Sequence, residues 1–137
     1  MARKLEELHV YNRAVRGHMA VSALIKLSTF RNERKLIEQL ADAADSVPSN
    51  IGEGFGRSDA QFILFLEYAR GSANEVRTHL ISACHRGCIT EATQEAMDIR
   101  YAIIGRMLTR LIQHLRRKNT KPPENSKSRK QKPPPTH

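Results

Sequence analysis

The stretch DSVPSNIGEGFGR, residues 45–57, decides the fold of this chain. It places a proline inside an apolar repeat and follows it with three glycines at alternate positions. The repeat has spacings of three and four residues, which are typical of a helix seam, and its members are Ile37, Leu40, Ala44, Val47 and Ile51. Because Pro48 lacks an N–H and crowds the preceding turn, a helix that continues through it is predicted to kink. The glycines predict the end of that helix.

Three further segments show helical periodicity. The first is predicted from about Leu5 to Lys26, with one apolar side made of Leu8, Tyr11, Val15, Met19, Ser22 and Ile25. A loop, residues 28–32, then leads into the second helix near Glu33, with Asn32 as its expected N-cap. Ser58 is the expected N-cap of the third helix, with Gln61 completing a capping box. The third helix is predicted to end at Gly87, and Thr90 to cap the fourth.

Both later helices carry an apolar seam. The predicted core residues of the third are Phe62, Phe65, Ala69, Ala73, Val76, Leu80 and Ala83. Those of the fourth are Met97, Tyr101, Ile104, Leu108, Leu111 and Leu115. No alternating pattern of useful length predicts a strand. Four helices joined by short loops predict an all-α, antiparallel, up-down four-helix bundle whose second helix is kinked.

The 137 residues suit one domain followed by a tail. We expect the bundle over residues 1–117 and a disordered, basic, proline-rich tail over 118–137. From Arg116 onward the chain has eight Lys or Arg, one Glu and five Pro but no apolar residue, so this stretch cannot offset its ordering entropy. It carries +7 of the chain's net charge of +9. Such a tail attracts polyanions, or it only aids solubility.

The sequence also bears on the compartment. No apolar run approaches the length of a membrane span, and the N-terminus turns acidic at once, unlike a signal peptide. Two cysteines without a secretion signal favour a reducing compartment. We therefore expect a cytoplasmic protein with no membrane partner.

Basic residues recur along the predicted helices at helical spacing. The fourth helix carries Arg106 and Arg110 on one side, and the third carries Arg70 and Arg77. The expected nucleic-acid-binding residues are Arg13, Arg16, Arg70, Arg77, Arg106, Arg110, Arg117, Lys118 and Lys121. Without an aromatic ladder, they predict contacts with phosphates of RNA or DNA and no base readout. The alternative is a solvated face with local pairs such as Glu67–Arg70 or Glu75 near Arg77.

A second apolar stripe on the fourth helix lies off its seam: Ile99, Ile103 and Met107. The third helix has Leu64, Tyr68 and Ile81 off its seam. Because a lone bundle needs one apolar face per helix, the extra stripe predicts an oligomer interface. A wide core face is the alternative.

No arrangement in the chain predicts an enzyme, a cofactor or a metal site. Cys84 and Cys88 lie near His79 and His85, but buried cysteine commonly packs as a small hydrophobe. The glycines of residues 52–56 follow no strand and precede no Lys-Ser/Thr, so they predict an interhelical turn and not a phosphate loop. No nucleophile–base pair or paired carboxylates are apparent.

The central stretch closely resembles the 23S rRNA intervening-sequence proteins, also called bacterial four-helix-bundle proteins. The residues that carry the resemblance are Ser46, Pro48, Asn50, Glu53, Gly54, Gly56 and Arg57, extended by the FL..A.GS pattern of residues 65–72. It covers roughly residues 8–115, and this chain has Val47 where Ile is usual and Gly52 where Ala is usual. We expect the matched polar residues to be structural.

The resemblance implies a four-helix protomer in a homopentameric ring. The same superfamily includes the accessory variability determinant proteins of diversity-generating retroelements, which bind nucleic acid and assist a reverse transcriptase. We therefore expect a non-catalytic, oligomeric nucleic-acid-binding protein, with a reverse transcriptase as one possible partner. The alternative is a protein-interaction scaffold with no nucleic-acid role.

Overall fold

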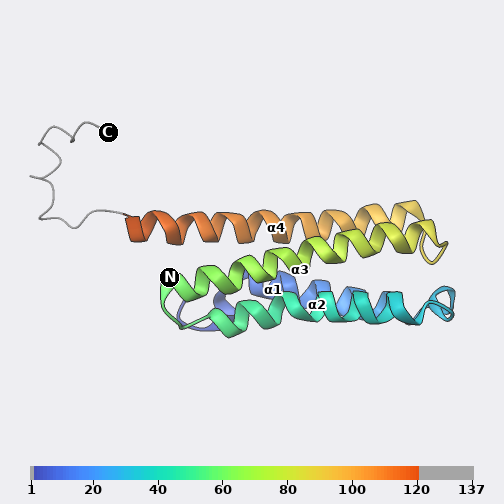
Figure 1. Ribbon diagram of the computed structural model, residues 1–137, viewed down its shortest axis with the longest axis horizontal. Coiled ribbons are helices and arrows are strands. Elements are labelled where there is room, and N and C mark those ends of the chain that lie inside the picture. Colours follow the sequence, from blue (N-terminus) through green and yellow to red (C-terminus); the bar gives the residue numbers. More distant parts are fainter. Residues whose placement is uncertain (1, 121–137) are drawn as a thin grey trace, which may run out of the picture.

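A computed structural model describes residues 2–120, all of whose regular structure is helical. The elements are η1 Leu5–Glu7, α1 His9–Leu24, η2 Ser28–Phe30, α2 Arg34–Gly54, α3 Asp59–His85 and α4 Glu91–Thr120. Successive long helices run in opposite directions (Figure 1). The predicted all-α, four-helix architecture is confirmed. Within residues 2–120, none of the helices has the length and apolar content needed to cross a membrane.

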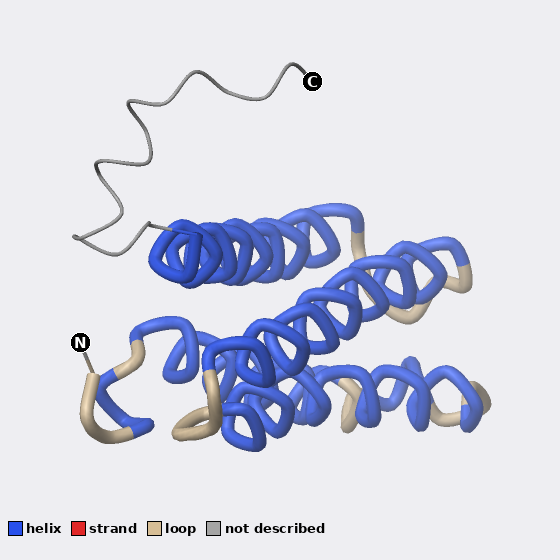
Figure 2. Tube along the Cα trace, turned by 60° about the vertical axis from the view of Figure 1, so that its left-hand side comes forward, coloured by secondary structure: helices blue, strands red, loops and turns tan. Residues whose placement is uncertain are grey.

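The third helix is central to the packing. α3 contacts both α2 and α4 extensively, whereas α1 packs mainly on α2 and less on α4. Figure 2 shows α3 crossing between α4 and the layer that contains α2. The two flanks of α3 therefore form two different interhelical surfaces.

The helix ends follow the predicted caps in three of four places. The Gln61 N–H donates to Ser58 Oγ at the start of α3, and the Thr93 N–H donates to Thr90 Oγ1 before α4. Gly87, with φ of 79°, follows α3 in the left-handed conformation that glycine favours. Asn32 does not cap α2, because the residue before α2 is Glu33.

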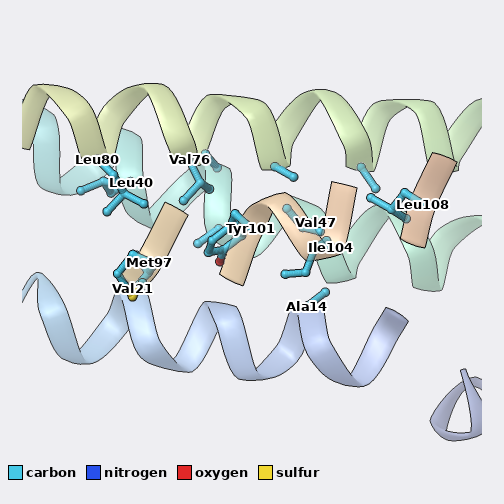
Figure 3. Close-up of a cluster of buried hydrophobic side chains, with 14 of the residues drawn as sticks. Ala14, Val21, Leu40, Val47, Val76, Leu80, Met97, Tyr101, Ile104 and Leu108 are labelled. Atoms are coloured by element: carbon cyan, nitrogen blue, oxygen red, sulfur yellow. The ribbon is translucent and has the colours of Figure 1, made fainter. Parts of the chain in front are cut away.

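The core lies where the four helices meet (Figure 3). In α2, four of the five predicted seam residues, Leu40, Ala44, Val47 and Ile51, are fully buried, and Ile37 is half-buried. In α3 and α4 most predicted seam residues are also buried, but Leu66 and Ile112 are fully buried where we expected Phe65 and Leu111. At both points the buried residues are spaced by four and then three, where the prediction had three and then four, and the seam on either side is as predicted.

The predicted apolar side of α1 is right only in part, because Leu8, Tyr11 and Ile25 pack against the core from half-buried positions. The buried residues of α1 are Val10, Ala14, Gly17 and Val21. Met19, which we expected inside, is 65% exposed. The interhelical contact uses small residues that let α4 approach closely, and a prediction weighted toward large apolar side chains misses them.

Pro48 lies inside α2 and is buried. The helix is continuous from Arg34 to Gly54, and Val47 and Ile51 on either side of the proline both face the core. The seam therefore continues through the proline, as expected. A kink at this point stays a prediction.

α4 extends to Thr120, beyond the predicted end of the bundle at residue 117. Disorder from Arg116 onward is therefore wrong for residues 116–120. The last turns are held to α3 by ion pairs of Arg116 with Glu67 and of Lys118 with Asp59. The rest of the predicted tail, Lys121 included, lies outside the described residues.

Candidate nucleic-acid interface

A groove of about 500 Å³ runs between α3 and α4. It is lined by Arg70, Asn74, Arg77, Ala102, Gly105, Arg106, Thr109, Arg110 and Gln113. The two arginine rows recognised separately in the sequence thus face one groove. Sequence periodicity placed each row on a helix side, but it could not show that the two sides adjoin.

The groove is open because α4 presents small residues to it beside its arginines. Ala102 and Gly105 line it, and a Cβ built on Gly105 would have no neighbour within 4 Å. The spacing of three and four residues keeps Ala102, Gly105, Arg106 and Thr109 on one side of α4. The long arginine side chains therefore border a shallow channel that is not filled by other side chains.

Two of the four arginines are held in place. Arg77 makes two hydrogen bonds to the Asp98 carboxylate, at 2.7 and 3.2 Å, and these raise the pKa of Arg77. Arg70 donates to Thr109 Oγ1 at 3.1 Å and lies 4.0 Å from Glu67. The expected Glu67–Arg70 pair is therefore present, but Arg77 pairs with Asp98 of α4 and not with Glu75.

The other two arginines supply the unneutralised charge. Within residues 2–120, the side chains of Arg106 and Arg110 have no ion-pair partner, and both are exposed. Surface ion pairs contribute little to stability, so a solvated face is compatible with folding alone. Two unpaired guanidinium groups beside a channel can also bind an anionic ligand with bidentate hydrogen bonds.

The remaining predicted nucleic-acid-binding residues lie elsewhere. Arg13 and Arg16 are exposed on α1, which does not line this groove. Arg117 and Lys118 lie near the C-terminal end of α4, and Lys118 pairs with Asp59 at 3.4 Å. The structure brings together four of the named cations, whereas Arg13, Arg16, Arg117 and Lys118 do not line this groove.

The motif residues at 46–57 bind α2 to α3. Asn50 Nδ2 donates to the backbone carbonyl of Ser46 at 2.8 Å and to its Oγ at 2.9 Å. Ser72 Oγ, from α3, donates to the same Ser46 Oγ at 2.9 Å. This network joins the two helices at a half-buried position.

The end of the motif fits closely against α3. A Cβ on Gly54 would lie 2.7 Å from the Cβ of Phe65, so glycine permits the approach of the two helices. Arg57 pairs with Glu53 and places its guanidinium 5.1 Å from the centre of the Phe65 ring. Gly56, with φ of 85°, makes the turn. The observed contacts of the motif are thus structural ones.

The exposure of the predicted interface stripe changes along α4. Ile99 is 52% exposed, whereas Ile103 and Met107 are half-buried and Met107 packs against the core. Leu64, Tyr68 and Ile81 on α3 are also exposed. Ile99, Ile103, Arg106 and Arg110 follow one another at spacings of four, three and four, so they share one side of α4. We missed this continuity of apolar and basic residues, although the spacing in the sequence contains it.

The cysteines do not form a metal site with their neighbours. Cys84 is half-buried and Cys88 is buried, and burial raises the pKa of the Cys88 thiol. In the part of the chain that the structure describes, no group of three or more His, Cys, Asp or Glu residues could hold a metal ion.

The comparisons with known proteins agree with the motif. The family model described as 23S rRNA-intervening sequence protein matches residues 6–110. The chain belongs to this family. The structure is similar to a crystal structure from Bacteroides thetaiotaomicron, with a TM-score of 0.68 and 25% sequence identity. That structure is of a protein of unknown function from the S23 ribosomal protein family. The similarity covers 75% of this chain and 97% of that chain. No curated protein matches the sequence.

Proposed function

We propose that this protein is a non-catalytic nucleic-acid-binding protein that holds a phosphate backbone in the groove between α3 and α4. The observation that carries this function is the presence of Arg106 and Arg110 beside that groove without ion-pair partners among the described residues. Both guanidinium groups are exposed and can each donate to two phosphate oxygens. Arg70 and Arg77 line the opposite side of the groove, on α3.

The polar lining supports backbone contact without base readout in the groove. Asn74 and Gln113 add amide groups to the arginines, and the described lining includes no aromatic side chain. Phosphate contacts of this type fix the position of a strand but carry no sequence information. Binding is therefore expected to depend steeply on salt and weakly on sequence.

RNA is the first ligand to test, because the family takes its name from intervening sequences of 23S rRNA. We propose a reverse transcriptase as a further partner, on the strength of the resemblance to retroelement accessory proteins. Copurification of a tagged protein with its RNA and protein partners tests both. A scaffold role without nucleic acid is the alternative if only protein is recovered.

We also propose that the protein assembles through α4, with five copies implied by the family resemblance. The supporting observation is the 52% exposure of Ile99 on the same side of the helix as Ile103. Exposed apolar side chains are common singly, but a row on one helix side favours an interface. Arg106 and Arg110 continue that row, so assembly would bring the arginine grooves of neighbouring copies close together.

The decisive experiment compares two charge-reversal pairs. Arg106→Glu with Arg110→Glu should abolish binding of fluorescein-labelled RNA measured by anisotropy at low salt. Arg13→Glu with Arg16→Glu makes the same change in net charge outside the groove and should weaken binding far less. An equal loss of RNA affinity in the two variants would show that binding depends on net charge and not on the groove. No binding by the unaltered protein, to RNA or DNA, would refute the function.

A further inference from the structure

The surface between α3 and α4 changes the sign of its charge along its length. The arginine groove occupies one part of it, and a second cavity, of about 410 Å³, lies nearer the start of α4. Three carboxylates line this second cavity, those of Glu91, Glu95 and Asp98. Asp98 pairs at 2.7 Å with Arg77 of the groove, so the basic and acidic parts meet at this ion pair.

The other two carboxylates are not neutralised. Glu91 and Glu95 are exposed, and neither has an ion-pair partner within residues 2–120. Glu91 lies in the first turn of α4, where the helix dipole favours a carboxylate, but Glu95 lies beyond that turn. Together with Arg106 and Arg110, they give α4 four exposed charges that the described bundle does not pair.

The four charges are arranged symmetrically about the middle of α4. Glu95 and Arg106 lie equally far along the chain from the midpoint between residues 100 and 101, and so do Glu91 and Arg110. The exposed Ile99 lies next to that midpoint. Spacings of four, four, seven and four place these five residues on one side of the helix. This side is acidic, then apolar, then basic, and so it complements a copy of itself that runs in the opposite direction.

The charged side of α4 is accessible to another molecule. Figure 1 and Figure 2 both show α4 at the edge of the bundle. The buried residues Tyr101, Ile104 and Leu108 lie on the opposite side of the helix. Ala92 and Ala96 are exposed beside the charges. Because the distance between two packed helices depends on the side chains at their contact, these small residues let a second helix approach closely.

A second copy of the chain fits this side when the two α4 helices are antiparallel. In a parallel pair in register, like charges would face each other, which is costly. In an antiparallel pair related by a two-fold axis at the midpoint, Glu95 faces the partner's Arg106 and Glu91 faces the partner's Arg110. Ile99 then lies against the partner's Ala102. By symmetry each contact occurs twice, so ion pairs flank an apolar centre on both sides.

We propose that α4 pairs antiparallel with α4 of a second copy and that this pairing covers Arg106 and Arg110. The carboxylates of the second copy then occupy the guanidinium groups that otherwise bind phosphate, so pairing and nucleic-acid binding exclude each other. This competition rests on the proposed function, whereas the pairing does not. A two-fold contact closes at two copies, so the charges of this chain favour a dimer where the family resemblance implies five copies.

Charge reversal tests the pairing, with the mass of the full-length protein measured by light scattering at micromolar concentration and low salt. Glu91→Arg with Glu95→Arg makes the side wholly basic, and Arg106→Glu with Arg110→Glu makes it wholly acidic. Each variant alone should therefore be monomeric, and an equal mixture should regain the mass of two copies. Circular dichroism checks that both variants fold. Added salt should dissociate the unaltered dimer, because exposed ion pairs are screened.

Three results would overturn the pairing. The first is an unaltered protein whose mass is not that of two copies. The second is a reversal variant that keeps the mass of the unaltered protein. The third is a mixture of the two folded variants that stays monomeric.

Neutral substitutions test the competition at protein concentrations where the unaltered protein is paired. Glu91→Gln with Glu95→Gln should give a monomer that binds fluorescein-labelled RNA at least three-fold more tightly than the unaltered protein. Glu38→Gln with Asp42→Asn is the matched control, because it makes the same change in net charge at the same spacing on exposed positions of α2. The control should stay dimeric and gain less affinity.

The pairing and the proposed function fail in distinguishable ways. An equal gain in RNA affinity in the neutral variant and its control would overturn the competition, because net charge alone would then explain the gain. RNA binding by an unaltered protein that is monomeric would overturn the pairing and leave the groove function intact. Mass changes as expected without RNA binding by any variant would support the pairing and refute the groove function.

Discussion

Gly17 of α1 lies directly against Tyr101 of α4: a Cβ built on Gly17 would meet the Tyr101 hydroxyl oxygen at 2.8 Å. Tyr101 is fully buried, and its hydroxyl has no hydrogen-bond partner among the described residues. At this contact α1 has no room for a side chain at position 17, and α4 buries a hydroxyl group without a hydrogen-bond partner among the described residues. Both halves of the contact can be tested by substitution.

Gly17→Ala should destabilise the bundle. The added methyl would collide with a rigid aromatic ring, and overpacking of this kind costs about 1–3 kcal/mol. Helix propensity returns up to about 1 kcal/mol, so the net loss is smaller. Urea unfolding followed by circular dichroism measures the change. Gly71→Ala is the control: its Cβ would meet nothing within 4 Å, so it should gain about 0.5–1 kcal/mol. If Gly17→Ala were more stable than the unaltered protein, α1 and α4 would be able to move apart at little cost.

Tyr101→Phe should preserve or raise stability, because it removes a buried hydroxyl whose unpaired burial costs about 1–3 kcal/mol. Burial also raises the pKa of Tyr101 above its ordinary value. The unfolded chain ionises first as pH rises, so the stability linked to this tyrosine is present below about pH 10 and falls above it. The free energy of unfolding should therefore fall less steeply above pH 10 in Tyr101→Phe than in the unaltered protein. A clear loss of stability in the variant at pH 7 would mean that the hydroxyl has a partner, such as a buried water.

Pro48→Ala should leave the fold intact, since it restores a backbone donor within a continuous helix and removes little packed volume. Far-ultraviolet circular dichroism should show undiminished helix content. Gly54→Ala offers a contrast in the same helix, because its methyl would meet the Phe65 Cβ at 2.7 Å. The glycine variant should lose about 1–3 kcal/mol by the overpacking argument. Loss of folding in the proline variant would mean that a bend at residue 48 is needed for the helices to meet.

Ile103→Glu should dissociate an oligomer that assembles through α4. Burying an unpaired charge in an apolar interface between protomers is costly. Ile103 is only half-buried within one protomer, so a glutamate at this position should disturb the interface more than the fold. Light scattering should show a fall in mass with unchanged helix content. An unaltered protein that is monomeric at micromolar concentration would contradict the assembly itself.

Removal of residues 121–137 separates the contribution of the C-terminal extension from that of the groove. The cut leaves α4 whole, because the helix ends at Thr120. It removes five positive charges, Lys121, Lys127, Arg129, Lys130 and Lys132. For every phosphate that the shortened protein no longer neutralises, the log–log salt slope should become shallower by about 0.7 for single strands or 0.9 for duplex. An unchanged slope would assign all binding to the bundle.

The sequence predicted the number of helices, most of their caps and the α2 seam because these depend on local spacing. The inward side of α1 was not predictable in the same way. Ala14 and Gly17 are buried because α4 approaches them, and small residues carry no apolar signal of their own. Leu111 and Ile112 are adjacent apolar residues, and spacing alone does not decide which of them is buried.

The candidate site was predictable only in pieces. Arg70 and Arg106 each belong to a row visible in the sequence, but the pairing of α3 with α4 brings the rows together. The choice of Asp98 as the partner of Arg77 depends on the same packing. A further cavity joins residues from both ends of the described chain, such as Leu8 and Leu115, which are too far apart in the sequence for one pattern to contain them.

The hydrogen bond between Ser46 and Ser72 lies on one flank of α3, and the arginine groove lies on the other. The contacts that join α2 to α3 can therefore stay fixed while the groove is altered. A library that varies Asn74, Arg106, Arg110 and Gln113 would leave the α2–α3 joint untouched. The bundle is thus suited to engineering as a carrier whose binding specificity is exchanged by altering one groove.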